Sequence, residues 1–254
     1  TSMWSAAVFD PAFPGRNRAA RSSPLPVETF LLVYKPEAHA SDGGVAISVG
    51  DPTNADNVAV TVPGINTEGG GAANGTRDAY NAYSSARFSD PNSSTASIFW
   101  LDYDSPSSDN AITDTPSQTM ADRGAITLNS FVRGLTENNP NAHYTAIGHS
   151  YGSMLVAQAG ADYNLPVDDF VLIGSPGPGQ SIDHATDLGV SADHVFVADA
   201  SDDNVSKISD GSFIHGPDIT REGFGAVRFE ADLRTQVSPS LGFRRPQPLL
   251  HPRV

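Results

Sequence analysis

The feature that most limits what this chain can form is the regular alternation of short apolar runs with segments of helical length. Strands are predicted at residues 29–34, 45–49, 58–62, 97–101, 143–147, 170–173, 195–198 and 226–229, and helices at residues 76–87, 116–135 and 151–163. Strands joined through helices pair in parallel by right-handed crossovers, whereas the first two strands, joined by a short Gly/Asp turn, are expected to be antiparallel. The predicted fold is therefore α/β, a three-layer sandwich whose mostly parallel sheet has helices on both faces and an antiparallel start.

The composition excludes several classes of protein and of site. The 254 residues include no Cys, which excludes a disulfide framework, a Cys-ligated metal and a cysteine nucleophile. Asp and Glu number 29 against 15 Lys and Arg, and the net charge of −14 argues against nucleic acid or an anionic membrane as a partner. No apolar run approaches the roughly 18 residues of a membrane-spanning helix, so we expect no transmembrane segment.

Motifs for cofactors are missing from the sequence. No G-x-G-x-x-G follows a predicted strand and no G-x-x-x-x-G-K-[ST] occurs, so we expect no bound nucleotide. The seven His show no H-x-x-H or similar ligand spacing. We therefore expect no metal and no other cofactor.

The ends of the chain differ in composition from its middle. Residues 1–27 are predicted to form an irregular arm or linker, because residues 10–26 are rich in Pro and Arg. The α/β domain is predicted over residues 28–232, and residues 233–254, again rich in Pro and Arg, form an atypical C-terminal tail. Thr1 precedes the first Met, so we expect the natural start to lie upstream, and the sequence leaves the compartment and the oligomeric state open.

A Gly-His-Ser-Tyr-Gly pentapeptide lies at residues 148–152, between a predicted strand and a predicted helix. G-x-S-x-G in this setting is typical of a nucleophile elbow, a sharp turn that exposes a strained serine at the carboxyl edge of a sheet. Gly148 and Gly152 leave room for neighbouring backbone, and the helix N-terminus favours a developing negative charge. Ser150 is therefore the predicted nucleophile, and we expect His149 to pack beside it.

An oxyanion hole needs two backbone N–H donors aimed at the charge that develops on a substrate carbonyl. The amide of Tyr151, directly after the predicted nucleophile, is the first expected donor. The second should come from the loop after the strand at 58–62, where Gly64 lets the backbone approach a ligand. We assign this role to the amide of Ile65, and a flexible loop without chemistry is the alternative interpretation.

The acid of such a site follows a later strand than the nucleophile does. Three carboxylates come after the strand at 195–198. Asp203 is preferred because its Asp-x-Val setting resembles the acid turn of many α/β-hydrolases. Asp202 and Asp199 are the second and third candidates, and each of the three could instead cap the following turn.

The base is expected last in the chain. Two His follow Asp203, namely His215 and His251. His215 precedes the last predicted strand, whereas the base usually lies beyond it, so His251 is the predicted base. The alternatives are a turn residue for His215 and a terminal tail, with little to hold an imidazole rigidly, for His251.

Several stretches around the pentapeptide form a set. They are residues 59–64, which end in Val-Pro-Gly, and residues 100–106, 148–153, 167–177 and 215–226. Together they resemble an actinobacterial α/β-hydrolase family of unknown function, over roughly residues 30–230. The resemblance implies an α/β-hydrolase domain with a serine-hydrolase-like site on Ser150 and an acid near Asp203. The family places its base in an H-x-x-Y-like segment soon after the last strand, where residues 230–240 of this chain contain no His.

The sequence thus predicts a serine hydrolase of the α/β-hydrolase type, an esterase or lipase-like enzyme acting on a small-molecule ester or acyl substrate. Ser150 would attack the carbonyl, the amides of Tyr151 and Ile65 would hold the oxyanion, and His251, oriented by Asp203, would move the proton. Acyl transfer to an alcohol is one alternative. The other is a binding or interaction domain on a hydrolase scaffold without turnover, since the His is in an unusual place.

Overall fold

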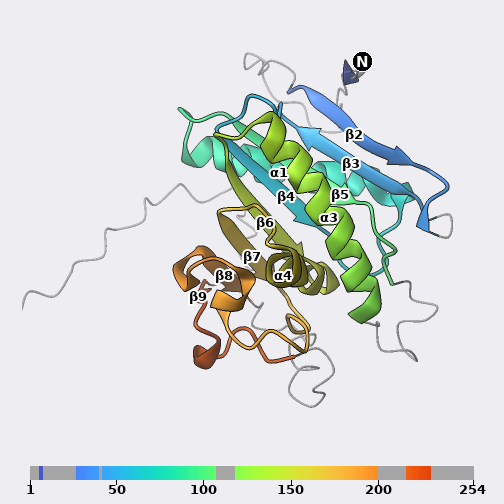
Figure 1. Cartoon of the computed structure of the whole chain (residues 1–254). Helices are drawn as coiled ribbons and strands as arrows, with labels where there is room; N and C mark the ends of the chain where they lie inside the picture. The colour runs from blue at the N-terminus through green and yellow to red at the C-terminus, as the bar shows by residue number, and fades with distance from the viewer. Residues whose placement is uncertain (1–5, 8–26, 40–41, 107–117, 199–215, 230–254) are drawn as a thin grey trace, which may run out of the picture.

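A nine-stranded sheet forms the centre of the described chain (Figure 1). The computed structural model describes residues 6–7, 27–39, 42–106, 118–198 and 216–229. The strands are β1 (Ala6–Ala7), β2 (Thr29–Lys35), β3 (Gly44–Val49), β4 (Asn57–Val62), β5 (Thr95–Leu101), β6 (His143–His149), β7 (Asp169–Ile173), β8 (Val195–Ala198) and β9 (Val227–Arg228). They lie side by side in the order β1-β2-β3-β5-β4-β6-β7-β8-β9.

The pairing divides the sheet into two parts. β1 to β2, β2 to β3 and β3 to β5 are antiparallel pairs, whereas every pair from β5 through β4 to β9 is parallel. The predicted antiparallel start and mostly parallel sheet are confirmed. The chain moves from β4 to β5 in one direction and then crosses to β6 on the other side of β4. Ligands bind where the direction of winding reverses, at the carboxyl ends of the strands, which here are the ends of β4 and β6.

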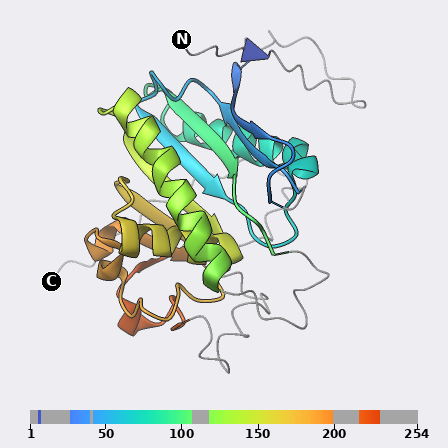
Figure 2. The same ribbon diagram turned by 45° about the vertical axis from the view of Figure 1, so that its right-hand side comes forward.

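Helices cover both faces of the sheet. The α-helices are α1 (Ala72–Ser89), α3 (Gln118–Asn138) and α4 (Tyr151–Tyr163), and the short 3₁₀ turns are η2 (Gly69–Gly71), η3 (Ala185–Leu188), η4 (Ala192–His194) and η5 (Glu222–Phe224). α1 lies on one face, and α3 and α4 lie together on the other (Figures 1 and 2). This arrangement is the three-layer sandwich that the alternation of strands and helices predicts.

β5 shows why the apolar runs of this chain are continuous rather than alternating. Successive side chains of a strand point to opposite faces, and in this sheet both faces are covered. Phe99 packs against α1 at Gly75, where an added Cβ would lie 2.5 Å from the Phe99 ring. The next residue, Trp100, points the other way and packs at 6.2 Å, centroid to centroid, on Phe131 of α3. Both strand residues are buried, so β5 must be apolar on both sides.

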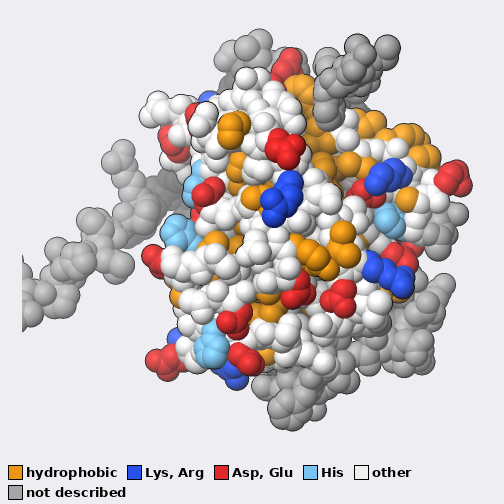
Figure 3. All heavy atoms as spheres, viewed as in Figure 1, with side chains coloured by type: hydrophobic (Ala, Val, Ile, Leu, Met, Phe, Trp, Pro, Cys, Tyr) orange, Lys and Arg blue, Asp and Glu red, His pale blue; other side chains and the backbone are white. Residues whose placement is uncertain are grey.

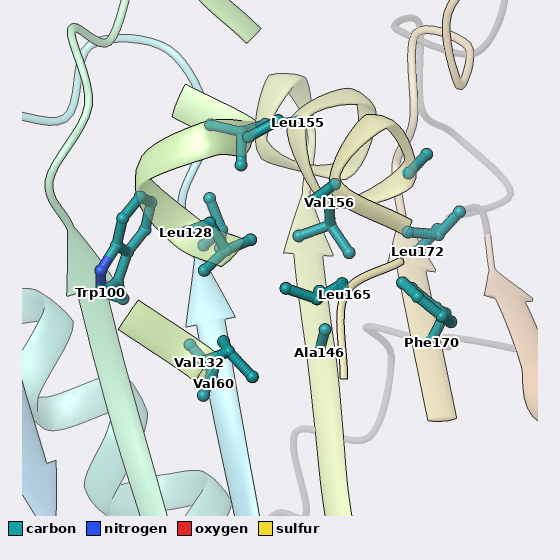
Figure 4. Packing of buried hydrophobic residues seen from close by; sticks show 14 of the residues in the cluster. Val60, Trp100, Leu128, Val132, Ala146, Leu155, Val156, Leu165, Phe170 and Leu172 are labelled. Carbon is teal, nitrogen blue, oxygen red and sulfur yellow. The ribbon is translucent and has the colours of Figure 1, made fainter. Parts of the chain in front are cut away.

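The larger part of the core lies between the sheet and the pair α3 and α4 (Figure 4). Gly124 of α3 allows the two helices to approach closely, because a Cβ there would lie 2.3 Å from a methyl group of Leu155 on α4. The residues that Figure 4 labels, all buried, are Val60, Trp100, Leu128, Val132, Ala146, Leu155, Val156, Leu165, Phe170 and Leu172.

The sequence-based boundaries differ from the observed ones by a few residues. The helix predicted at 76–87 begins at Ala72, and the one predicted at 151–163 has the observed bounds. Ala6–Ala7 pairs with β2, although both residues fall within the predicted arm at 1–27. Apart from these two residues and Val27, the arm lies outside the described residues, as does the whole predicted tail at 233–254.

Acidic and basic side chains are interspersed on the face of the molecule that Figure 3 shows. On that face, and for the residues that the structure describes, the basic side chains form no continuous area. None of the described helices is long and apolar enough to cross a membrane.

Two histidines share one carboxylate at the amino ends of β6, β7 and β8, the edge of the sheet opposite Ser150. Nε2 of His143 lies 2.6 Å from one oxygen of Asp169, and Nδ1 of His194 lies 2.8 Å from the other oxygen. The hydrogen bond with Asp169 raises the pKa of His194, and the nearby carboxylates of Asp193 and Asp168 act in the same direction.

We expect the stability that His194 contributes to depend on pH. The pKa of His194 is raised in the folded chain above its value of about 6.5 in the unfolded chain, so the charged imidazole stabilises the fold. The contribution should be fully present below about pH 6.5 and lost as the pH rises through the folded-state pKa. Denaturant unfolding of the wild type and His194→Gln should therefore give free energies of unfolding that converge as the pH rises. A difference that stays constant with pH would contradict this prediction.

Candidate active site

Ser150 lies in the sharp turn between β6 and α4, with φ of 53° and ψ of −128°. A residue with a side chain reaches this region only at a cost of roughly 1–3 kcal/mol, which its surroundings must offset. The amide of Ser150 donates to the carbonyl of Ile173 at 2.8 Å. Its own carbonyl accepts from the amide and the hydroxyl of Ser153, at 2.9 and 2.6 Å. Hydrogen bonds on both sides therefore hold the strained serine at the N-terminus of a helix.

Both glycines of the pentapeptide lie in close contact with the backbone of other residues. A Cβ on Gly148 would lie 2.4 Å from Cα of Ser153. A Cβ on Gly152 would lie 2.4 Å from the carbonyl oxygen of Val62 and 2.5 Å from that of Pro63. Backbone atoms cannot move aside as the end of a side chain can, so no other residue fits either position. The contact at Gly152 allows the first turn of α4 to pack directly on the end of β4.

The loop after β4 passes directly beside the Ser150 side chain. A Cβ on Gly64 would lie 2.7 Å from Cβ of Ser150 and 3.1 Å from its Oγ. The structure thus brings together Ser150, Tyr151 and Ile65, three of the residues that the sequence predicts for the site. Ser150 itself is half-buried, with its hydroxyl at the carboxyl edge of the sheet.

Tyr151 has a structural role besides that of its amide. Its side chain is 2% exposed, and its phenol oxygen accepts a hydrogen bond of 3.0 Å from the amide of Ala121 in the first turn of α3. Burial raises the pKa of the Tyr151 phenol. The residue after the serine therefore links the elbow to the helix that packs beside α4.

The prediction that His149 packs beside the elbow is wrong, because its side chain is exposed. Neighbouring residues of a strand point to opposite faces, and Gly148 occupies the face that packs on α4. His149 therefore points to the other face of the sheet.

The predicted acid and base, Asp203 and His251, lie outside the described residues. The same holds for the alternatives Asp199, Asp202 and His215. What the structure does show is the strand that precedes the acid candidates. β8 ends at Ala198, whose carbonyl accepts a 3.0 Å hydrogen bond from the amide of Gly174, directly after β7. The chain therefore leaves β8 at the same edge of the sheet as the elbow.

The sequence analysis missed two residues that contact the loop beside Ser150. The hydroxyls of Tyr103 and Ser105 donate to the carbonyls of Pro63 and Gly64. The only signal in the sequence is that both fall in the stretch at 100–106 that carries the family resemblance. In the part of the chain that the structure describes, no group of three or more His, Asp or Glu is arranged to hold a metal ion.

Comparison with protein families gives a match to the model described as "Alpha/beta hydrolase" over residues 39–212. The chain belongs to the alpha/beta hydrolase family. The uncharacterised protein Rv0963c of Mycobacterium tuberculosis (strain H37Rv) is 36% identical over 215 residues, which cover 81% of this chain and 74% of that protein. The uncharacterised protein Rv2079 of the same strain is 33% identical over 246 residues, which cover 86% of this chain. This alpha/beta hydrolase chain spans 37% of the length of Rv2079.

Solved structures of esterases are also similar to this chain. Esterase PE8 is 16% identical with a TM-score of 0.47, covering 73% of this chain and 87% of that one. The Bacillus cereus carboxylesterase is likewise 16% identical with a TM-score of 0.47, covering 74% of this chain and 84% of that one.

We expect Gly152→Ala and Gly134→Ala to change stability in opposite directions. Gly152→Ala should destabilise the protein by at least about 1–3 kcal/mol, because the methyl group collides with the carbonyls that end β4. Gly134 lies in α3 with nothing within 4 Å of an added Cβ, so Gly134→Ala should stabilise by roughly 0.5–1 kcal/mol. Urea unfolding of both variants checks the prediction. Equal effects of the two substitutions would show that α4 does not need its close contact with β4.

Proposed function

We propose that this alpha/beta hydrolase is a serine esterase, which cleaves carboxylic esters through an acyl-enzyme on Ser150. The observation that carries the proposal is the backbone of Ser150, strained at φ of 53° in the turn between β6 and α4, with its hydroxyl against Gly64. Strain of this kind persists only where surrounding contacts maintain it, and it occurs preferentially at functional sites. It supports a nucleophile because it projects the hydroxyl from the sheet edge toward a bound substrate.

In the proposed reaction Ser150 Oγ attacks the carbonyl carbon of the ester while its proton passes to His251. The N–H groups of Tyr151 and Ile65 bind the oxyanion, and the N-terminus of α4 adds a favourable potential. The tetrahedral intermediate collapses, and the alcohol leaves with the proton from His251. Water then attacks the acyl-enzyme as His251 takes its proton, and the acid is released when the bond to Ser150 Oγ breaks and that oxygen receives the proton from His251. Asp203 orients the imidazole and stabilises its charged form.

The position of β8 supports an acid from the segment that follows it. β8 is two strands from β6, so the ends of these strands are separated by about 10 Å at roughly 4.8 Å per strand. An imidazole with a hydrogen bond of about 2.8 Å on either side fits a gap of this size. A carboxylate after β8 and a serine after β6 are therefore suitably spaced for one histidine between them.

Reaction with a fluorophosphonate probe tests the nucleophile. We expect stoichiometric labelling of the folded wild-type chain, with the modified peptide containing Ser150. Ser150→Ala should abolish labelling and the hydrolysis of p-nitrophenyl acetate. Ser130→Ala is the matched control, since Ser130 is exposed in α3 and its hydroxyl donates to the carbonyl of Ile126 within the same helix. Labelling that survives in Ser150→Ala, or is absent from the folded wild type, would refute the proposal and favour a binding domain without turnover.

Variants of the candidate acids and bases test the rest of the triad. His251→Ala should lower kcat about 10³-fold or more while fluorophosphonate still binds slowly, and Asp203→Ala should lower it by a comparable factor. His215→Ala, Asp202→Ala and Asp199→Ala are the controls and should retain most of the activity. A large loss in one of these variants, with full activity in His251→Ala or Asp203→Ala, would move the role to that residue.

A further inference from the structure

Hydroxyl groups hold two successive carbonyls of the loop beside Ser150. The phenol of Tyr103 donates to the carbonyl of Pro63 at 2.7 Å. The carbonyl of Gly64 accepts from Ser105 at 3.0 Å and from Thr67 at 2.9 Å, and the phenol of Tyr103 makes a longer contact with it at 3.5 Å. Tyr103 and Ser105 are 3% and 5% exposed. Because water does not compete at these buried groups, the hydrogen bonds fix the direction of both carbonyls.

The direction of the Gly64 carbonyl determines where the amide of Ile65 points. The two groups belong to one peptide unit, and in a trans peptide the C=O and the N–H point in opposite directions. No cis peptide occurs in the described residues. The Gly64 carbonyl points to the buried hydroxyls, so the Ile65 N–H points away from them. The next peptide is held too, because the amide of Asn66 donates to the carbonyl of Pro106 at 2.9 Å.

Tyr103 also connects the loop to the elbow. Its ring is stacked on the ring of Tyr151, with centroids 6.4 Å apart and planes 11° apart. On the other side it is stacked on Trp100, at 6.2 Å and 5°. Burial raises the pKa of the Tyr103 phenol, so the group remains a hydrogen-bond donor at any pH at which the protein works. One side chain thus touches both segments that supply the proposed oxyanion donors.

We propose that Tyr103 and Ser105 are positioning residues of the oxyanion hole, which hold the Ile65 amide at a fixed distance from the Tyr151 amide. The inference rests on the proposed function and deepens it. Neither hydroxyl reaches the substrate, because each donates to a carbonyl on the buried side of the loop. Their contribution is to prevent the Gly64–Ile65 peptide from rotating when charge develops on the substrate, so that the hole is formed before the reaction begins.

Removing one hydroxyl at a time tests the proposal in the 254-residue chain. Tyr103→Phe keeps the stacked ring and loses the bond to Pro63 together with the longer one to Gly64, and Ser105→Ala loses one bond to Gly64. We expect each variant to lower kcat for p-nitrophenyl acetate about 10-fold, with KM changed by less than about 2-fold, because the donor is misaligned only toward the transition state. The affinity for a trifluoromethyl ketone, which forms an anionic hemiketal on the serine, should fall by the same factor as kcat/KM.

Tyr144→Phe is the matched control. Tyr144 is also 3% exposed, and its phenol lies 3.0 and 2.9 Å from the carbonyls of Leu135 and Asn139, at the opposite edge of the sheet. The variant should lower the urea midpoint about as much as Tyr103→Phe does, with kcat unchanged. Equal kcat values in Tyr103→Phe and Tyr144→Phe would overturn the proposal. A fall in kcat without a matching fall in the affinity for the trifluoromethyl ketone would also overturn it.

A measurement that needs no turnover separates this inference from the proposed function. The amide order parameters of Gly64 and Ile65, from ¹⁵N relaxation, should fall in Tyr103→Phe and stay unchanged in Tyr144→Phe. Unchanged order parameters in Tyr103→Phe would overturn the positioning role even in an active esterase. Failure of the wild type to react with fluorophosphonate would refute the esterase, and a fall in the order parameters would still show that Tyr103 holds the loop.

Discussion

At Gly152 the first turn of α4 lies directly on the carbonyls of Val62 and Pro63, with no room for even a methyl group between them. This contact brings the end of β4 and the start of α4 together, and the other features of the site follow from it. The contact requires a glycine two positions after Ser150 and a tight turn between β6 and α4. This tight turn forces Ser150 into a strained conformation. The strain is maintained by the hydrogen bond that Ser150 donates to Ile173 and by those that it accepts from Ser153.

The buried aromatic side chains behind the carboxyl edge of the sheet help to hold the segments around Ser150 in place, as the elbow does. Trp100, Tyr103 and Tyr151 stack in sequence between β5, α3 and α4, and the phenols at the site end of this column bind backbone groups. One phenol donates to the loop after β4, and the other accepts from the first turn of α3. The buried core is therefore continuous with the two segments beside Ser150. Such continuity suits a site whose dipoles must be in place before charge develops.

The chain is an alpha/beta hydrolase, and its parallel strands place three loops at one edge. The loops follow β4, β6 and β8, so the proposed oxyanion donor, nucleophile and acid come from segments far apart in sequence but close in the sheet. Among mycobacterial relatives the same unit forms most of Rv0963c and a smaller part of Rv2079.

Apart from β1, the strands, the α-helices and the Gly-His-Ser-Tyr-Gly turn could be predicted from residues near one another in the chain, because periodicity and turn chemistry are local. Three features could not be predicted in this way. They are the order of the strands, the exposure of His149, and the hydrogen bonds from Tyr103 and Ser105 to the loop after β4. Tyr103 is 40 residues from Pro63 in the chain, and nothing in the local pattern of either segment shows that they meet. They meet because β5 and β4 pair in parallel and end together. The proposed nucleophile can thus be picked out in the sequence, whereas the contacts that support the proposed oxyanion hole exist only once distant strands have packed.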